Sequence, residues 1–135
     1  MNVLVDTSVW SLMLRRDAPR GSAEERELIE LIQEDRVVLI GPVRQELLSG
    51  VRASEHFELL RTRLHAFPDV ALGPLDYEEA ARCFNRCRAK DVQGSNTDFL
   101  LCAVALTRDL AILTTDKDFV GFRKVLRVKL HALRD

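Results

Sequence analysis

Short apolar runs alternate with longer amphipathic stretches along this chain. Residues 2–5, 37–40 and 111–114 have the length and composition of buried strands. Between such runs, apolar residues recur at helical spacing, as at Leu28 and Ile32. This alternation predicts an α/β fold in which parallel strands are joined by crossover helices.

The same pattern places the individual elements. It predicts five strands, at Asn2–Val5, Val37–Ile40, Val70–Leu72, Ala111–Thr114 and Val125–Lys129. It predicts helices over residues 7–14, 22–33, 42–50, 54–67, 76–90 and 96–108. Thr7 or Ser8 is expected to cap the first helix, and Ser22 with Glu25 to form a capping box on the second.

Size and composition indicate one globular domain over residues 1–135. Hydrophobic residues make up 47% of the chain and charged residues 30%, which excludes a mainly disordered protein. No apolar stretch approaches the roughly 20 residues that cross a bilayer, and the N-terminus lacks a basic leader. We therefore expect a cytoplasmic protein with no membrane partner.

Three cysteines, Cys83, Cys87 and Cys102, raise the question of a zinc site. Such a site needs two further close ligands, and the histidines are scattered along the chain. Buried free thiols in a reducing compartment are the favoured interpretation.

Four carboxylates lie at strand ends and helix starts, where a ligand site is expected in an α/β fold. Asp6 follows the first strand, Asp116 follows the run 111–113 by two residues, and Glu46 and Asp98 lie near the starts of predicted helices. In open α/β sheets, ligands bind at the carboxyl ends of the strands. Several carboxylates gathered there would repel one another unless a hard divalent cation such as Mg²⁺ or Mn²⁺ lies between them.

Each acid also has a structural explanation. Asp6 is a potential N-cap, Glu46 an exposed helix charge, Asp98 a partner of the helix dipole and Asp116 a turn residue. The shared placement of the four, at two strand ends and two helix starts, favours a metal site.

Four segments, residues 3–10, 42–50, 97–103 and 113–119, together resemble a known family. The chain looks like a PIN-domain ribonuclease and is most similar to the VapC toxins of bacterial toxin–antitoxin pairs. The resemblance covers nearly the whole chain. It implies a three-layer fold with a central parallel sheet of about five strands, ordered 3-2-1-4-5, between helices.

The resemblance also assigns roles to individual residues. The family's acidic positions match Asp6, Glu46, Asp98 and Asp116, with Asp118 as a further acid that some members use. Thr114, and Ser8 where many members have Asn, match groups that support the acids by hydrogen bonds. The implied chemistry is RNA phosphodiester hydrolysis with one or two Mg²⁺ ions, or Mn²⁺ in their place, which activate water and neutralise phosphate charge.

RNA binding requires positive charge near these acids. The net charge is −1, but removing the four candidate ligands from 21 acids leaves 17 against 20 Lys and Arg. Arg82, Arg86 and Lys90 recur every four residues on one predicted helix face, a candidate RNA contact that pairing with acids such as Glu78 would also explain. Arg15 with Arg16, and the basic C-terminal residues up to Arg134, are further candidate patches.

The expected function is that of a Mg²⁺-dependent endoribonuclease, the toxin of a VapBC-type pair. The implied partners are a VapB-like antitoxin, whose C-terminal segment would dock on helices within residues 9–14 and 57–64, and a structured RNA such as tRNA or rRNA. The resemblance also implies a homodimer that assembles further with antitoxin. Two alternatives stay open: a PIN nuclease that matures RNA without an antitoxin, and a catalytically silent binding module.

Overall fold

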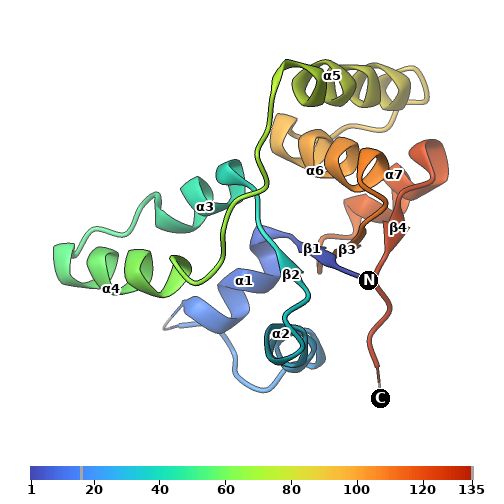
Figure 1. The fold of residues 1–135 in the computed structure, drawn as a ribbon. Coiled ribbons are helices and arrows are strands. Elements are labelled where there is room, and N and C mark those ends of the chain that lie inside the picture. The colour runs from blue at the N-terminus through green and yellow to red at the C-terminus, as the bar shows by residue number, and fades with distance from the viewer. Residues whose placement is uncertain (16, 135) are drawn as a thin grey trace.

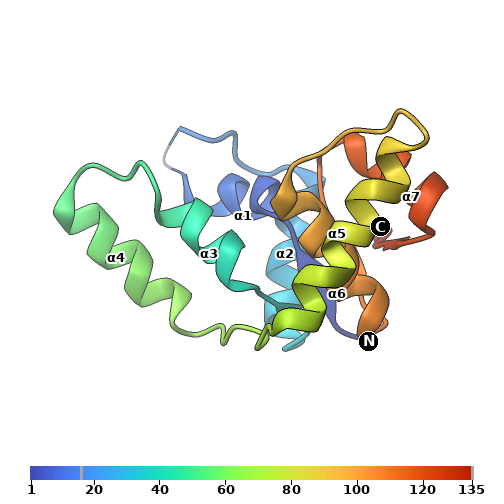
Figure 2. The same cartoon turned by 90° about the horizontal axis from the view of Figure 1, so that it is seen from above.

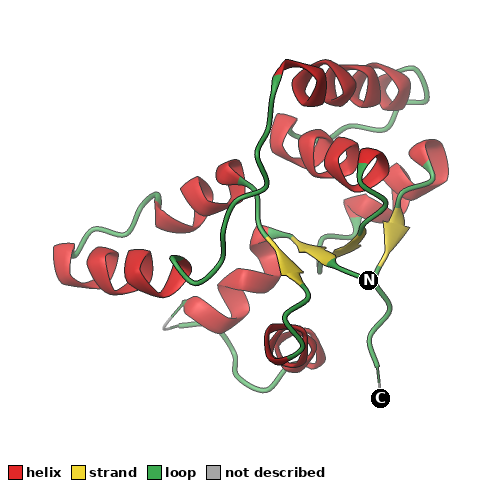
Figure 3. Cartoon of the chain, viewed as in Figure 1, coloured by secondary structure: helices red, strands yellow, loops and turns green. Residues whose placement is uncertain are grey.

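A short parallel sheet lies at the centre of the molecule. The computed structural model describes residues 1–15 and 17–134. Within this part of the chain the strands are β1 (Val3–Val5), β2 (Val37–Val38), β3 (Ala111–Leu113) and β4 (Lys129–Leu130). They run parallel in the order β2-β1-β3-β4 (Figure 3). In the register of the sheet, Val3 pairs with both Val37 and Ala111, and Ala111 pairs with Lys129.

Seven helices surround this sheet in the described residues. They are α1 (Thr7–Leu14), α2 (Ala23–Gln33), α3 (Gly41–Leu48), α4 (Ser54–Leu64), α5 (Pro74–Arg88), α6 (Asn96–Thr107) and α7 (Asp118–Leu126). Helices α5, α6 and α7 lie on one side of the sheet, and α1 and α2 lie on the other (Figure 1). The predicted three-layer α/β fold is therefore confirmed.

Helices α3 and α4 form an arm at the edge of this core. Seen from above, α4 lies well away from α5 and α6, and α3 leads back towards the sheet (Figure 2). Helix α3 contacts both α1 and α4. No helix in the described part of the chain is long and apolar enough to cross a bilayer.

Burial explains why the strands are short and apolar. All three residues of β1 are fully buried, as a parallel strand covered on both faces requires. Helix α6 is also almost wholly buried from Phe99 to Ala105. The three cysteines are buried and free, as predicted.

Two strand predictions need correction. The predicted strand Val70–Leu72 is reduced to one parallel bridge between Leu39 and Asp69, because it is confined between Pro68 and the α5 residue Pro74. The predicted strand Val125–Lys129 is wrong, since Val125 belongs to α7 and β4 begins only at Lys129.

Helix α7 was not predicted from the sequence. It buries Phe119, Phe122 and Leu126, whose spacing of three and four residues is helical. Arg127 then takes a left-handed conformation with φ of 63° and ends the helix. The run of basic residues that follows Phe122 concealed this apolar stripe.

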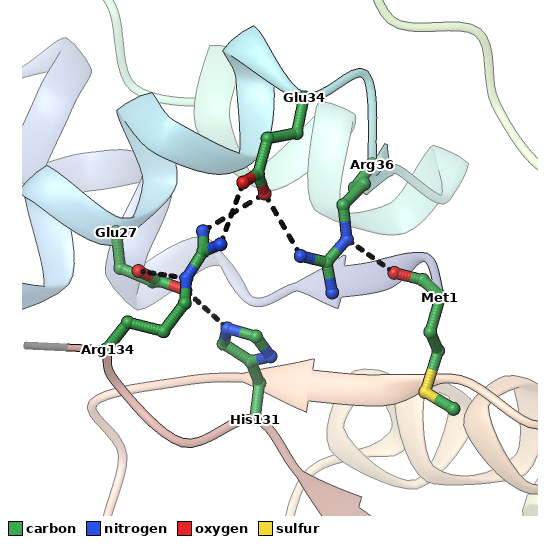
Figure 4. Close-up of polar contacts among 6 residues, drawn as sticks. All are labelled: Met1, Glu27, Glu34, Arg36, His131 and Arg134. Carbon is green, nitrogen blue, oxygen red and sulfur yellow. Dashed lines mark hydrogen bonds and ion pairs between the residues drawn. The ribbon is translucent and has the colours of Figure 1, made fainter.

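A polar network fixes the C-terminal segment to α2. Glu27 is 4% exposed and accepts hydrogen bonds from the His131 ring, at 2.5 Å, and from Arg134 Nε, at 3.0 Å (Figure 4). Arg134 also forms two hydrogen bonds to Glu34, which Arg36 contacts from the other side. We call Glu27, Glu34, His131 and Arg134 the C-terminal network.

Candidate active site

Four carboxylates from separate elements line one open cavity. Its volume is about 630 Å³. Asp6 follows β1, Glu46 lies on α3, Asp98 lies in the first turn of α6, and Asp116 follows β3. We call this the acidic cavity. The structure therefore brings together the four acids that the sequence singled out, at the carboxyl ends of β1 and β3.

Asp6 is the most buried of the four, with 7% exposure. It occupies the N-cap position of α1, but its side chain makes no capping hydrogen bond. Asp6 Oδ2 instead accepts hydrogen bonds from Ser8 Oγ and Thr114 Oγ1, both at 2.8 Å. These two donors satisfy a carboxylate oxygen that burial removes from water.

The prediction that Thr7 or Ser8 caps α1 is wrong. Both residues lie inside the helix, and both hydroxyls bind carboxylates. Thr7 Oγ1 donates to Glu46 Oε1 at 2.6 Å, which connects α1 to the exposed acid on α3. Thr7 is the site residue that sequence analysis missed, although it directly follows Asp6.

Ser8 and Thr114 join the ends of β1 and β3. Besides donating to Asp6, Thr114 Oγ1 accepts from the backbone N–H of Asp116 at 2.9 Å. Ser8 Oγ accepts from the backbone N–H of Thr115 at 3.1 Å. Each hydroxyl thus orients a carboxylate and fixes the loop that carries Asp116.

Asp98 lies at the start of α6, where it forms a capping box with Ser95. Its Oδ2 accepts from the Ser95 backbone N–H at 3.0 Å, and Ser95 Oγ accepts from the Asp98 N–H at 3.1 Å. Burial raises the pKa of Asp98, the Ser95 bonds oppose that rise, and the charges of Asp6 and Asp116 add to it. The pKa of Asp98 is raised on balance, chiefly because of burial, and the neighbouring charges of Asp6 and Asp116 contribute to the rise.

Asp116 and Asp118 share a tight turn. Asp116 Oδ1 accepts from the Asp118 backbone N–H at 2.9 Å. Asp118 itself is exposed at the start of α7 and does not line the acidic cavity. Its side chain therefore lies outside the group formed by the other four acids.

The donor set suits a hard divalent cation, although the ligands are not preassembled. No three His, Cys, Asp or Glu side chains in residues 1–15 and 17–134 are already grouped to hold a metal. Each of the four acids has one oxygen hydrogen-bonded to a nearby donor, and the second oxygen of each has no hydrogen bond within those residues. Mg²⁺ and Mn²⁺ prefer oxygen ligands, and a bound cation of this kind would also reduce the repulsion between the carboxylates.

Arg15 is the one basic residue that lines the acidic cavity in the described part of the chain. It directly follows α1, and its neighbour Arg16 lies outside the described residues. Arg15 is therefore the cation best placed to meet a phosphate at the acids.

The other basic candidates lie elsewhere. Arg82, on α5, pairs with Glu79 at 3.0 Å and not with Glu78, and Arg86 donates to the Val125 carbonyl of α7 at 3.3 Å. Lys90 follows α5, and none of this stripe lines the acidic cavity. In the C-terminal patch, Arg134 is held in the C-terminal network.

Comparison with known proteins identifies the family. The PIN domain profile matches residues 3–125, and the chain belongs to this family. The structure resembles FitAcB from Neisseria gonorrhoeae, with a TM-score of 0.75, 21% identity and 96% of each chain covered. It also resembles VapBC2 from Rickettsia felis bound to a DNA fragment from their promoter, with a TM-score of 0.77, 14% identity and coverage of 97% of this chain and 98% of that one.

A third similar structure is VapBC-1 from nontypeable Haemophilus influenzae, with a TM-score of 0.72, 14% identity and 97% of each chain covered. A comparison with curated proteins gives no significant match. The resemblance to PIN domains and to the VapC toxin fold is confirmed; at these identities the similar structures establish fold alone.

Proposed function

We propose that this protein is a metal-dependent endoribonuclease and the toxin of a VapBC-type toxin–antitoxin pair. The observation that carries the proposal is the acidic cavity, where four carboxylates from four elements converge beside Arg15. A structural protein gains nothing from gathering repelling charges, whereas phosphodiester hydrolysis with Mg²⁺ needs them. The proposal treats residues 1–135 as a single nuclease domain that acts in the cytoplasm.

The proposed roles follow from position. Asp6, Glu46, Asp98 and Asp116 would hold one or two Mg²⁺ ions, or Mn²⁺ in their place, with Asp118 as an additional acid if the turn at Asp116 opens. A bound ion supplies Lewis acidity that activates water and neutralises phosphate charge. Ser8 and Thr114 orient Asp6, and Arg15 binds the RNA phosphate by charge-assisted hydrogen bonds.

Arg82, Arg86 and Lys90 are proposed only as an outer RNA contact. Arg82 and Arg86 lie on α5 and Lys90 follows it, and none of the three lines the acidic cavity, so they would meet phosphates distant from the cleaved bond. An RNA that contacts both the acidic cavity and these residues extends well beyond the cleaved bond. Both tRNA and rRNA contain structured segments that can do so, so either class is a suitable substrate.

The first test is cleavage of total RNA and tRNA by purified, partner-free protein with Mg²⁺, Mn²⁺ or EDTA. We expect discrete fragments with either metal and intact RNA in EDTA, because the proposed hydrolysis needs a bound cation to activate water and to neutralise phosphate charge. Cleavage that continues in EDTA would contradict the proposal and indicate a contaminating nuclease. Folded protein that cleaves neither RNA with either metal would favour the catalytically silent binding module.

Thr114→Val tests the support of the acids. Valine has nearly the shape of threonine but donates no hydrogen bond to Asp6 and accepts none from Asp116. Loss of such an outer partner typically lowers activity by about 10- to 100-fold, and we expect that reduction in kcat with little change in KM. Thr115→Val is the matched control, since Thr115 is exposed and contributes only its backbone to Ser8. Equal activity of the two variants would exclude the proposed role of Thr114.

An antitoxin would bind the groove beside α1. One cavity there, of about 420 Å³, is lined by Trp10, Met13 and Leu64 together with apolar residues of α2. An adjoining cavity of about 440 Å³ includes Leu47 and Leu60. Both are lined by residues of the segments 9–14 and 57–64, on which we expect an antitoxin to dock. An apolar groove that accepts a partner helix is a recurrent mode of recognition.

This chain shares its fold with the similar structures from Neisseria, Rickettsia and Haemophilus, and that shared fold supports the antitoxin proposal. We also propose a homodimer that assembles further with antitoxin. A short adjacent gene for a DNA-binding protein would favour this function over RNA maturation by a PIN nuclease without an antitoxin.

A further inference from the structure

A second cavity adjoins the acidic cavity. It lies between α5 and α6 and has a volume of about 550 Å³. Pro42 and Thr97 line both cavities, so the two are contiguous. We call it the aromatic cavity, after the residues that give it its character: Tyr77, Phe84, Phe99, Asn85, Asn96 and Thr97.

The lining combines flat apolar surface with neutral polar groups. Phe84 packs edge-on against Phe99, with ring centroids 5.4 Å apart, and Tyr77 stands 54% exposed at the rim. Asn85 on α5 and Asn96 at the start of α6 supply amide donors and acceptors. None of the residues that line this cavity in the described part of the chain is charged.

These features match one class of ligand. An unpaired nucleobase offers a π-face for aromatic stacking and a polar edge for amide hydrogen bonds, and it carries no charge. The cavity volume falls in the range of small-molecule sites. An anionic group would find no cation in the lining, whereas the neighbouring acidic cavity has Arg15 and the metal-binding acids for a phosphate.

We propose that the aromatic cavity binds one unpaired RNA base next to the phosphate that is cleaved. The inference rests on the proposed ribonuclease function and deepens it. Asn96, Thr97 and Asp98 are consecutive at the start of α6, so the same helical turn faces the base and the acids. The enzyme would therefore cut single-stranded or looped RNA, with a base preference set by Asn85 and Asn96.

Binding of short RNA tests this inference without requiring cleavage. All proteins carry Asp6→Asn so that the RNA stays intact, and a fluorescein-labelled pentanucleotide is titrated with Mg²⁺ present. A series of pentanucleotides varies the central base among the four natural bases, and one member is abasic at the centre. Tyr77→Ala should weaken binding of the best-bound member about tenfold, the size expected for one lost base stack.

The abasic RNA gives the decisive comparison. If the lost contact is between Tyr77 and the base, the abasic RNA should bind with equal affinity to Tyr77→Ala and to its parent. Asn85→Ala should change the ranking of the four bases. Leu75→Ala is the matched control, because Leu75 is an exposed apolar residue on the same helix that does not line the cavity.

Three results would overturn the inference. They are equal losses from Tyr77→Ala on the intact and abasic RNA, equal effects of Tyr77→Ala and Leu75→Ala, and no binding of any pentanucleotide to the parent. Self-association that Tyr77→Ala abolishes, with RNA affinity unchanged, would instead assign the cavity to an interface between copies. If base-dependent binding is found but the unmodified protein cleaves no RNA, the aromatic cavity is a base-binding site, whereas the proposed function and the placement of the base beside a cleaved phosphate both fail.

Discussion

Asp98→Asn is expected to reduce RNA cleavage by at least about 100-fold, the scale seen when one preorganised electrostatic group is removed from an active site. The variant loses a charged ligand of the proposed metal site, while the amide oxygen can still accept the Ser95 backbone hydrogen bond. The helix start should therefore stay intact, and the loss should fall on kcat.

The same variant should melt at a higher temperature than the unmodified protein when both are free of metal. Burial and the charges of Asp6 and Asp116 raise the pKa of Asp98 in the folded chain, so at neutral pH its charged form opposes folding. Asparagine removes that repulsion. An active site whose charges cost stability is a common form of trade-off between stability and activity.

Cleavage rates and metal-free thermal melts of the two proteins measure both effects. Asp109→Asn is the matched control: its side chain is 75% exposed, and its left-handed backbone, with φ of 53°, also suits asparagine. Its surface ion pair with Lys129 contributes little, so both quantities should stay unchanged. A lower melting temperature for Asp98→Asn would show that Asp98 is structural, and unchanged cleavage would remove it from the site.

The acidic cavity could be predicted largely from the sequence. Asp6 directly follows a three-residue apolar strand, and parallel strands next to each other in a sheet must end at one edge. That rule, with the spacing of Glu46, Asp98 and Asp116, was enough to expect the four acids together. The order of the strands came from the family resemblance.

Contacts between distant residues could not be predicted in the same way. The bond from Thr7 to Glu46 depends on how the α3–α4 arm meets α1, and the aromatic cavity depends on how α5 packs on α6. Neither leaves a periodic signal within one segment. Helix α7 was missed for a local reason, because Arg123 and Lys124 interrupt its short apolar stripe.

The C-terminal network also depends on contacts between residues that are distant in sequence, and these contacts stabilise the folded C-terminal segment. Glu27 and Arg134 are separated by 107 positions in sequence, yet their hydrogen bonds hold the segment after β4 against α2. Burial raises the pKa of Glu27, but hydrogen bonds from His131 and Arg134 outweigh it and leave the pKa below the ordinary value of 4.5. The ionised form of Glu27 therefore favours the folded state.

Glu27→Ala should lower the free energy of unfolding by about 2 kcal/mol at neutral pH. This is somewhat less than the loss expected when one partner of a fully buried ion pair is removed, because Arg134 can turn towards water. The His131 ring, only 12% exposed, loses the hydrogen-bond partner of its Nε2 atom. Thermal or urea unfolding measures the change. Glu30→Gln, an exposed acid on the same helix, is the control and should leave stability unchanged.

Glu27→Gln separates the charge from the shape of the side chain. A group whose folded pKa is lowered contributes stability above its ordinary pKa, and that contribution is lost as the pH falls through the folded value. The stability gap between the unmodified protein and Glu27→Gln should therefore be constant near neutral pH and should close as the pH is lowered below 4.5. A gap that persists unchanged in acid would mean that packing, and not the ionised carboxylate, holds the C-terminal segment in place.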